Sequence, residues 1–185
     1  MSSTVRHAAL EILRRIQTQR LDLANAQAQI RPRLIDKRDR ALATEIVIGT
    51  LRWRAKLDFI IQKASSRPLN RIDADLLDLL RLSAYQLLHL DRVPAHAVVY
   101  EAVNLAAQLG KKSASPFINA VLRTIDREME SQQLPARPTD LQQTDQNIIL
   151  DYLSITQSHP RWLMERWCDR YGADATIMWT VFNNA

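Results

Sequence analysis

The stretch that decides the fold is "DADLLDLLRLSAYQLLHL", residues 73–90. At helical spacing its apolar residues fall on nearly every face, with few polar residues between them. A helix that is apolar all round must be covered on all sides. We therefore expect this helix at the centre of a bundle, surrounded by other helices. Asp73 stands where its carboxylate can cap the first turn.

Apolar residues at helical spacing predict further helices on both sides of this stretch. Few glycines and few aromatic residues, with many Leu, Ala, Gln and Arg, also favour helices over sheets. The fold class we predict is all-α, with about seven helices and no convincing strand. The expected signals include caps at Asp36, Asp58, Ser115 and Ser158, proline in the first turn at Pro116 and Pro160, and stops at Gly110 and Gly172.

Residues 131–146, "SQQLPARPTDLQQTDQ", combine two prolines with several glutamines. This composition is typical of a linker. It predicts a helical domain over residues 1–130 and a short helical extension over residues 147–185. The extension is too small to be a domain of its own.

Two residues of the helix expected near residues 36–54 are predicted to serve the fold. Gly49 costs a helix about 1 kcal/mol relative to alanine unless it permits a close approach. Trp53 ends the apolar stripe of Leu42, Ile46 and Gly49, and we expect it to pack in the core.

Chemistry-bearing motifs are weak in this chain. The four histidines are isolated, so the sequence predicts no metal site. Cys168 lies on the inner stripe of its helix, where a free thiol behaves as a small hydrophobe. The three glycines stand too far apart to form a phosphate loop. We expect no catalytic and no cofactor-binding residue here, and no membrane span. The single cysteine is compatible with a reducing cytoplasm.

Positive charge gathers at the start of the chain. Residues 1–56 hold 12 Lys and Arg against 5 Asp and Glu, a net charge of +7, whereas residues 57–130 are neutral and residues 131–185 carry −2. Segregated charge favours a polyanionic partner, and the planar guanidinium group matches phosphate. The alternative is a solvated helix face that only keeps the protein soluble. The candidate RNA contacts are Arg6, Arg14, Arg31, Arg33, Lys37, Arg38, Arg40, Arg52 and Arg54.

Trp162 and Trp179 in the extension admit two interpretations. They could stack on bases, as aromatic side chains do in proteins that bind single strands. We expect instead that they pack against protein, some of it outside this chain.

The order of four motifs carries a resemblance to a known family. "RHAALEIL", "ALATEIVIGTLRWRAKLDFII", "LLDLLRLSAYQLLHLDRVPAHAVVYEAVNLA" and "SPFINAVLR" together resemble the N-terminal domain of bacterial ribosomal RNA cytosine-5 methyltransferases of the Sun/Fmu (RsmB) type. That domain has the NusB-like all-α fold. The resemblance covers about residues 5–128, and "SHPRWLMERWCDRYG" with "FNN" resembles the segment that leads into the methyltransferase region.

The resemblance implies a division of labour. The helical domain would hold small-subunit ribosomal RNA, while a downstream domain would bind S-adenosylmethionine and use a cysteine to methylate cytosine. Cys168 matches neither catalytic cysteine of the family. We therefore expect a fragment of a longer protein that is inactive alone and that docks against its own methyltransferase domain. The resemblance also assigns Asn119 to the fold, its amide bonding backbone groups of an adjoining loop.

Two other functions remain open on the residues. One is a free-standing NusB-like antitermination factor that binds RNA and a protein partner. The other is a non-catalytic helical scaffold whose basic face only confers solubility.

Overall fold

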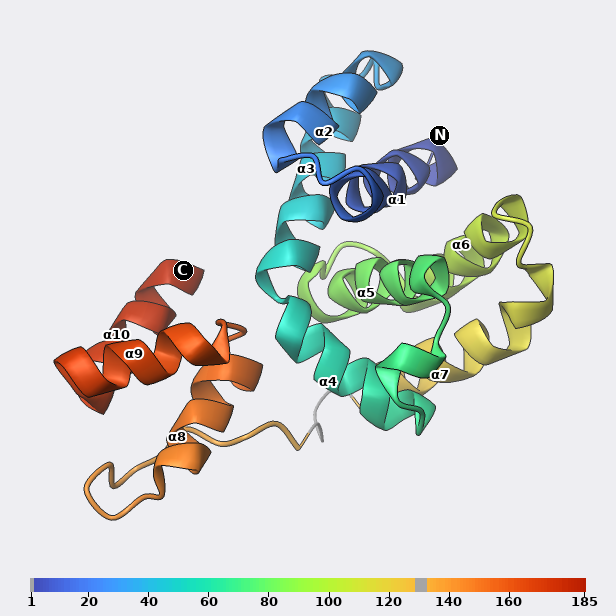
Figure 1. Ribbon diagram of the computed structural model, residues 1–185. Helices are drawn as coiled ribbons and strands as arrows, with labels where there is room; N and C mark the ends of the chain where they lie inside the picture. Colours follow the sequence, from blue (N-terminus) through green and yellow to red (C-terminus); the bar gives the residue numbers. More distant parts are fainter. Residues whose placement is uncertain (1, 129–132) are drawn as a thin grey trace.

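The computed structural model describes residues 2–128 and 133–185, and their regular structure is helical throughout, as the sequence predicts (Figure 1). Short 3₁₀ turns η1, η2 and η3 lie at Arg31–Arg33, Leu69–Arg71 and Lys112–Ala114. The helices of the first part are α1 Ser2–Thr18, α2 Leu23–Ile30, α3 Lys37–Arg52, α4 Arg54–Ser65, α5 Ala74–His89, α6 Ala95–Gln108 and α7 Ser115–Arg127.

Helix α5 lies at the centre of the bundle, as its apolar pattern predicts. It contacts α1, α3, α4, α6 and α7, which surround it in Figure 1. Every residue from Leu76 to Leu87 is buried. Asp73 caps the helix by accepting from the backbone N–H groups of Asp75 and Leu76. The most apolar stretch of the chain is therefore the core around which the other helices pack.

Charged side chains of α5 are buried in pairs. Arg81 Nε donates to Asp58 Oδ1 at 2.6 Å, and its Nη1 donates to Asp78 Oδ1 at 2.9 Å. Burial raises the pKa of the Asp78 carboxyl, and the same aspartate accepts from Gln17 of α1. The prediction that Asp58 caps a helix was wrong, because α4 begins at Arg54 and this carboxylate is used by Arg81 instead.

At the other helix ends, the predicted caps and stops are confirmed in some cases and wrong in others. Asp36 accepts from Arg38 N, as predicted, and Gly110 ends α6 with a φ of 76°. Ser115 does not cap α7; it is the first helical residue, and its hydroxyl donates to Lys112 O. Ser158 does not cap the next helix either, because α9 begins after Pro160.

A second group of helices follows residues 133–145, which form no helix. The predicted linker starts two residues earlier, outside the described part of the chain. A smaller apolar cluster of Ile149, Leu150, Leu153, Met164 and Ile177 holds these helices together, separate from the main core. The elements are α8 Gln146–Asp151, a π-helical turn η4 Tyr152–Thr156, α9 Arg161–Tyr171 and α10 Ala173–Asn184.

Ser158 ties this second group to the bundle. It has a φ of 58°, and its Oγ accepts from the backbone N–H groups of Ala55 at 2.8 Å and Lys56 at 3.2 Å. Helix α4 has no side-chain cap from its own N-cap residue, Trp53. The serine expected to cap α9 therefore caps the first turn of α4, about a hundred residues earlier in the chain.

Candidate nucleic-acid interface

One face of α3 is exposed along the whole helix. Arg38, Ala41, Glu45, Ile48 and Arg52 are exposed at intervals of three and four residues, whereas the opposite face is buried against α1 and α5. These five residues are called the α3 stripe below. Since a helix rises 1.5 Å per residue, the stripe places Arg38 and Arg52 about 21 Å apart on the same side.

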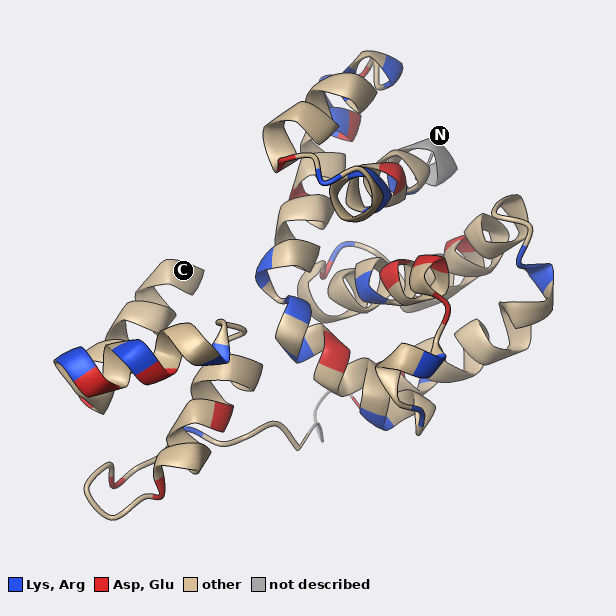
Figure 2. Ribbon diagram, in the orientation of Figure 1, with Lys and Arg blue, Asp and Glu red and all other residues tan. Residues whose placement is uncertain are grey.

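Cations gather at both ends of the stripe (Figure 2). At the first end, Arg31, Lys37 and Arg38 are exposed and form no ion pair with the described residues. The 3₁₀ turn η1 and the Asp36 cap fix the backbone there. Arg40 holds the loop between them by donating to Leu34 O at 3.0 Å and Ile35 O at 3.1 Å. The three free cations are called the first basic cluster.

At the other end, Trp53 is the single residue between α3 and α4, and this junction is called the corner below. Arg52 and Arg54 are exposed there and form no ion pair within the described ranges; together they are called the corner cluster. Lys56 Nζ lies 5.0 Å from the centre of the Trp53 ring, and burial lowers the pKa of this ammonium group. The corner thus concentrates positive charge beside a half-buried aromatic ring.

An aromatic stack supports this corner from behind. His89 lies between the rings of Trp53 and Tyr85, at centroid distances of 5.5 Å and 5.0 Å. Tyr85 also packs directly on Gly49, where an added Cβ would stand 1.9 Å from the ring, and its hydroxyl donates to Glu45. The close approach that would justify Gly49 is therefore present, and Trp53 packs partly buried against the main core.

Four of the nine predicted contacts are engaged by the protein itself. Arg6 is 4% exposed, bonds Gln86 and forms an ion pair with Glu101 at 2.6 Å, so its assignment to RNA is corrected to a role in the core. The other three are engaged but not buried, and their partners are Asp75 for Arg14, Glu11 for Arg33, and two loop carbonyls for Arg40.

Asn119 does not make the contact expected of it. Its Oδ1 accepts from Arg123 Nε at 3.1 Å, one turn along the same helix, instead of bonding the backbone of a loop. Asn119 is half-buried, so an alanine there would leave no deeply buried group without a partner. The prediction of a loop-anchoring amide is wrong.

The second group of helices exposes an aromatic face. Trp162 on α9 is 64% exposed, and Phe182 on α10 is 79% exposed, with exposed Met178 one turn before it on the same helix. Trp179 contacts Trp167 and Tyr171 edge-on and is still 40% exposed. Protein contacts therefore account for part of Trp179 but for little of Trp162.

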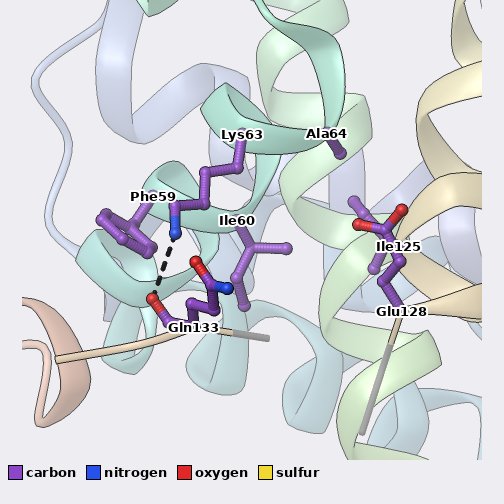
Figure 3. A pocket seen from close by; sticks show the side chains of 7 residues that line it. All are labelled: Phe59, Ile60, Lys63, Ala64, Ile125, Glu128 and Gln133. Carbon is purple, nitrogen blue, oxygen red and sulfur yellow. Dashed lines mark hydrogen bonds between the residues drawn. The ribbon is translucent and has the colours of Figure 1, made fainter. Parts of the chain in front are cut away.

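Other candidate sites are poor. A hollow of about 330 Å³ lies between α4 and the end of α7 (Figure 3). Its Lys63 donates to Gln133 O at 3.2 Å and lies over the Phe59 ring, so the chain itself uses the charge.

Burial raises the pKa of the Cys168 thiol, which disfavours the thiolate. The described residues contain no group of three metal-ligating side chains, and none of their helices is long and apolar enough to cross a membrane.

Comparison with known proteins gives one family and a consistent set of relatives. The NusB family matches residues 3–127. A "Probable ribosomal RNA small subunit methyltransferase B" of Bacillus subtilis is 32% identical over 178 residues, covering 94% of this chain and 36% of the relative. A "Ribosomal RNA small subunit methyltransferase B" of Proteus mirabilis is 34% identical over 165 residues, covering 89% and 35%.

A solved structure agrees at the level of the fold. The solution structure of NusB from Aquifex aeolicus superimposes with a TM-score of 0.61 at 20% identity, covering 75% of this chain and 97% of that one. The chain thus contains a whole bundle of this type, and it spans about a third of the length of the curated relatives.

Proposed function

Because the chain belongs to the NusB family, we propose that its bundle is the RNA-holding part of a methyltransferase that acts on small-subunit ribosomal RNA. Relatives with that name match this chain over little more than a third of their length. The methyl transfer to cytosine C5 would belong to the remainder of such a protein. The contribution of these residues is affinity and orientation.

The observation that carries the proposal is the pair of basic clusters at the two ends of the α3 stripe. Five exposed cations without ion pairs stand at its two ends, Arg31, Lys37 and Arg38 at one and Arg52 and Arg54 at the other. Cations that serve only solubility need no common face, whereas an extended phosphate backbone does. Only Glu45 places a negative charge on the stripe between them, and that carboxylate accepts from Tyr85.

S-adenosylmethionine would be held by the methyltransferase domain. The described residues offer no strand followed by a glycine-rich turn, and their three glycines do not cluster. These residues do not fit a cofactor site, so no chemical step is assigned to them.

The aromatic face of the second group supports a docking role for residues 147–185. Trp162, Met178 and Phe182 form exposed apolar surface of the kind that contacts another protein surface. We propose that it packs against the methyltransferase domain, with residues 1–130 as the separate RNA-holding domain. The antitermination factor and the helical scaffold are the competing functions.

The test is binding of this chain to a small-subunit ribosomal RNA hairpin, measured by fluorescence anisotropy. A variant with alanine at Arg31, Lys37, Arg38, Arg52 and Arg54 should lose most of its affinity at moderate salt. The matched control replaces five other exposed cations, none on α3: Arg71, Arg92, Lys112, Arg137 and Arg166. It should bind nearly as wild type. Equal loss in both variants would indicate non-specific attraction, and no binding by wild type would favour the scaffold.

A further inference from the structure

Beside the first basic cluster lies a hollow with a volume of about 980 Å³. Helix α2, turn η1 and the first half of α3 form its walls, and Ile12 of α1 contributes to its base. Figure 1 shows α2 beside α1 at this end of α3. The hollow exists because the facing side chains are small: Ala24 and Ala28 on α2, Ala41 and Thr44 on α3.

The lining is apolar in the middle, with cations at one end and the Glu45 carboxylate, which accepts from Tyr85, at the other. Ile30 and Leu34 are buried beside the hollow, whereas Arg31 and Lys37 line it while remaining exposed. Neither cation forms an ion pair with a described residue. Arg40 lines the hollow too, but its bonds to Leu34 O and Ile35 O fix the wall. A cavity with apolar walls and free cations at its rim suits a ligand that joins an apolar body to anionic groups.

Gln27 adds a hydrogen-bonding group to this lining. Its amide nitrogen is buried and has no partner among the described residues. Buried amide groups ordinarily find partners, so this amide is available to bond a ligand in the hollow once it turns toward it. Rotation of the terminal amide lets the same side chain offer either its N–H groups or its carbonyl.

We propose that this hollow receives the base of one unstacked nucleotide of the bound RNA. The base would lie between α2 and α3 with its polar edge toward Gln27, and the phosphates on either side would meet Arg31 and Lys37. Proteins that read RNA commonly splay out single bases, hydrogen-bond the edges of these bases and contact the neighbouring phosphates with cations. The inference rests on the proposed function, because it names what part of the RNA this end of α3 binds.

A peptide or a second copy of the chain fits these observations less well. An apolar helix face would fill the alanine-lined walls but would leave Arg31 and Lys37 without counter-charge. A nucleotide supplies the aromatic body, the hydrogen-bonding edge and the charge in one covalent unit. The need of Arg31 and Lys37 for a counter-charge therefore favours a nucleotide over an apolar helix.

The test combines a filled hollow with RNAs that lack one base. Ala28→Trp places an indole in the hollow from an exposed helical position, and Ala107→Trp on the exposed face of α6 is the matched control. Hairpins with a single abasic loop nucleotide keep every phosphate. We expect Ala28→Trp to weaken binding about 10-fold, the effect of losing a hydrogen-bonded base, with an unchanged salt dependence. We also expect one abasic position to weaken binding to wild type but not to Ala28→Trp. Gln27→Leu should weaken binding to the intact hairpin but should not further weaken binding to the hairpin that lacks this base.

The outcomes separate this inference from the proposed function. Suppose that every abasic hairpin binds wild-type protein as tightly as the intact hairpin does, and that both tryptophan variants bind the intact hairpin as tightly as wild-type protein does. If the affinity still depends on salt, the base pocket is refuted and the RNA-holding function stands. If wild type shows no salt-sensitive binding, both proposals fail. If Ala28→Trp leaves RNA affinity unchanged but alters the oligomeric state measured by analytical ultracentrifugation, the hollow is an interface between copies of the chain. That result also refutes the inference.

Discussion

At the scale of single residues, the packing of Tyr85 on Gly49 shapes the interface between α3 and α5. A Cβ at position 49 would stand 1.9 Å from Tyr85 Cζ. The ring is not free to turn away, since its hydroxyl donates to Glu45 and its face stacks on His89. Through His89, the Tyr85 ring also supports Trp53, which lies between the two arginines of the corner cluster.

Gly49→Ala is therefore expected to lower the free energy of unfolding by about 1–3 kcal/mol through overpacking, although alanine is the better helix former. Urea denaturation followed by circular dichroism measures it. Arg38→Ala, on the exposed stripe of the same helix, is the control and should change stability by about 0.5 kcal/mol or less. A Gly49→Ala protein as stable as wild type would show that the ring moves aside freely.

His89 makes stability depend on pH. Burial, with a contribution from nearby Lys56, lowers the pKa of the imidazole to about 4, while Glu45 acts in the opposite direction. Its unfolded pKa is about 6.5, so the unfolded chain binds more protons between these values. Stability should therefore fall as pH is lowered from about 6.5 toward 4. The slope stays below about 1.4 kcal/mol per pH unit, because a single proton is bound, and partial exposure of the ring lowers it further.

His89→Phe keeps an aromatic ring between Trp53 and Tyr85 but does not titrate. Urea denaturation at several pH values from 6.5 to 5 should show a shallower loss of stability in this variant than in wild type. The same pH dependence in both proteins would mean that other groups are responsible.

At the scale of the elements, helix ends show how local and distant interactions divide the fold. Helix α4 relies on Ser158 for its first turn, and this bond joins the bundle to the second group of helices. Ser158→Ala removes the acceptor and leaves the strained φ of 58° as it was. Comparison of the two proteins therefore isolates the hydroxyl group.

Loss of that cap should cost about 0.5–2 kcal/mol and accelerate hydrogen exchange at the amides of Ala55 and Lys56. Ser154→Ala is the control, because its hydroxyl donates to Leu150 O within its own group of helices and touches no amide of α4. Unaltered protection at both amides in Ser158→Ala would contradict the capping role.

The elements also show what the sequence could predict. Periodicity and the Asp36 and Asp73 caps are encoded within a few residues, so the helices were predicted well. The role of Asp58 depends on Arg81, 23 residues away, and that of Ser158 on a helix about a hundred residues away. The sequence does not distinguish Arg33 from Arg38, because Glu11 comes beside Arg33 only in the folded bundle. Which arginines remain free for a ligand therefore depends on the tertiary structure.

At the scale of the whole molecule, the bundle, the corner and the second group of helices place different surfaces on different sides. Helix α3 presents its stripe with basic clusters at both ends, and α10 presents an apolar face. The central claim is that RNA phosphates contact both basic clusters at once. A single cluster would suffice for attraction but would not fix an orientation.

The most direct measurement is the salt dependence of RNA affinity for two partial variants of this chain. Five phosphate contacts predict a log–log slope of about −3.5 for a single strand. Alanine at Arg31, Lys37 and Arg38 should make the slope shallower by about 2, and alanine at Arg52 and Arg54 by about 1.4. The two reductions should add in the combined variant. If either set leaves the slope at the wild-type value, RNA does not span α3, and the account is contradicted.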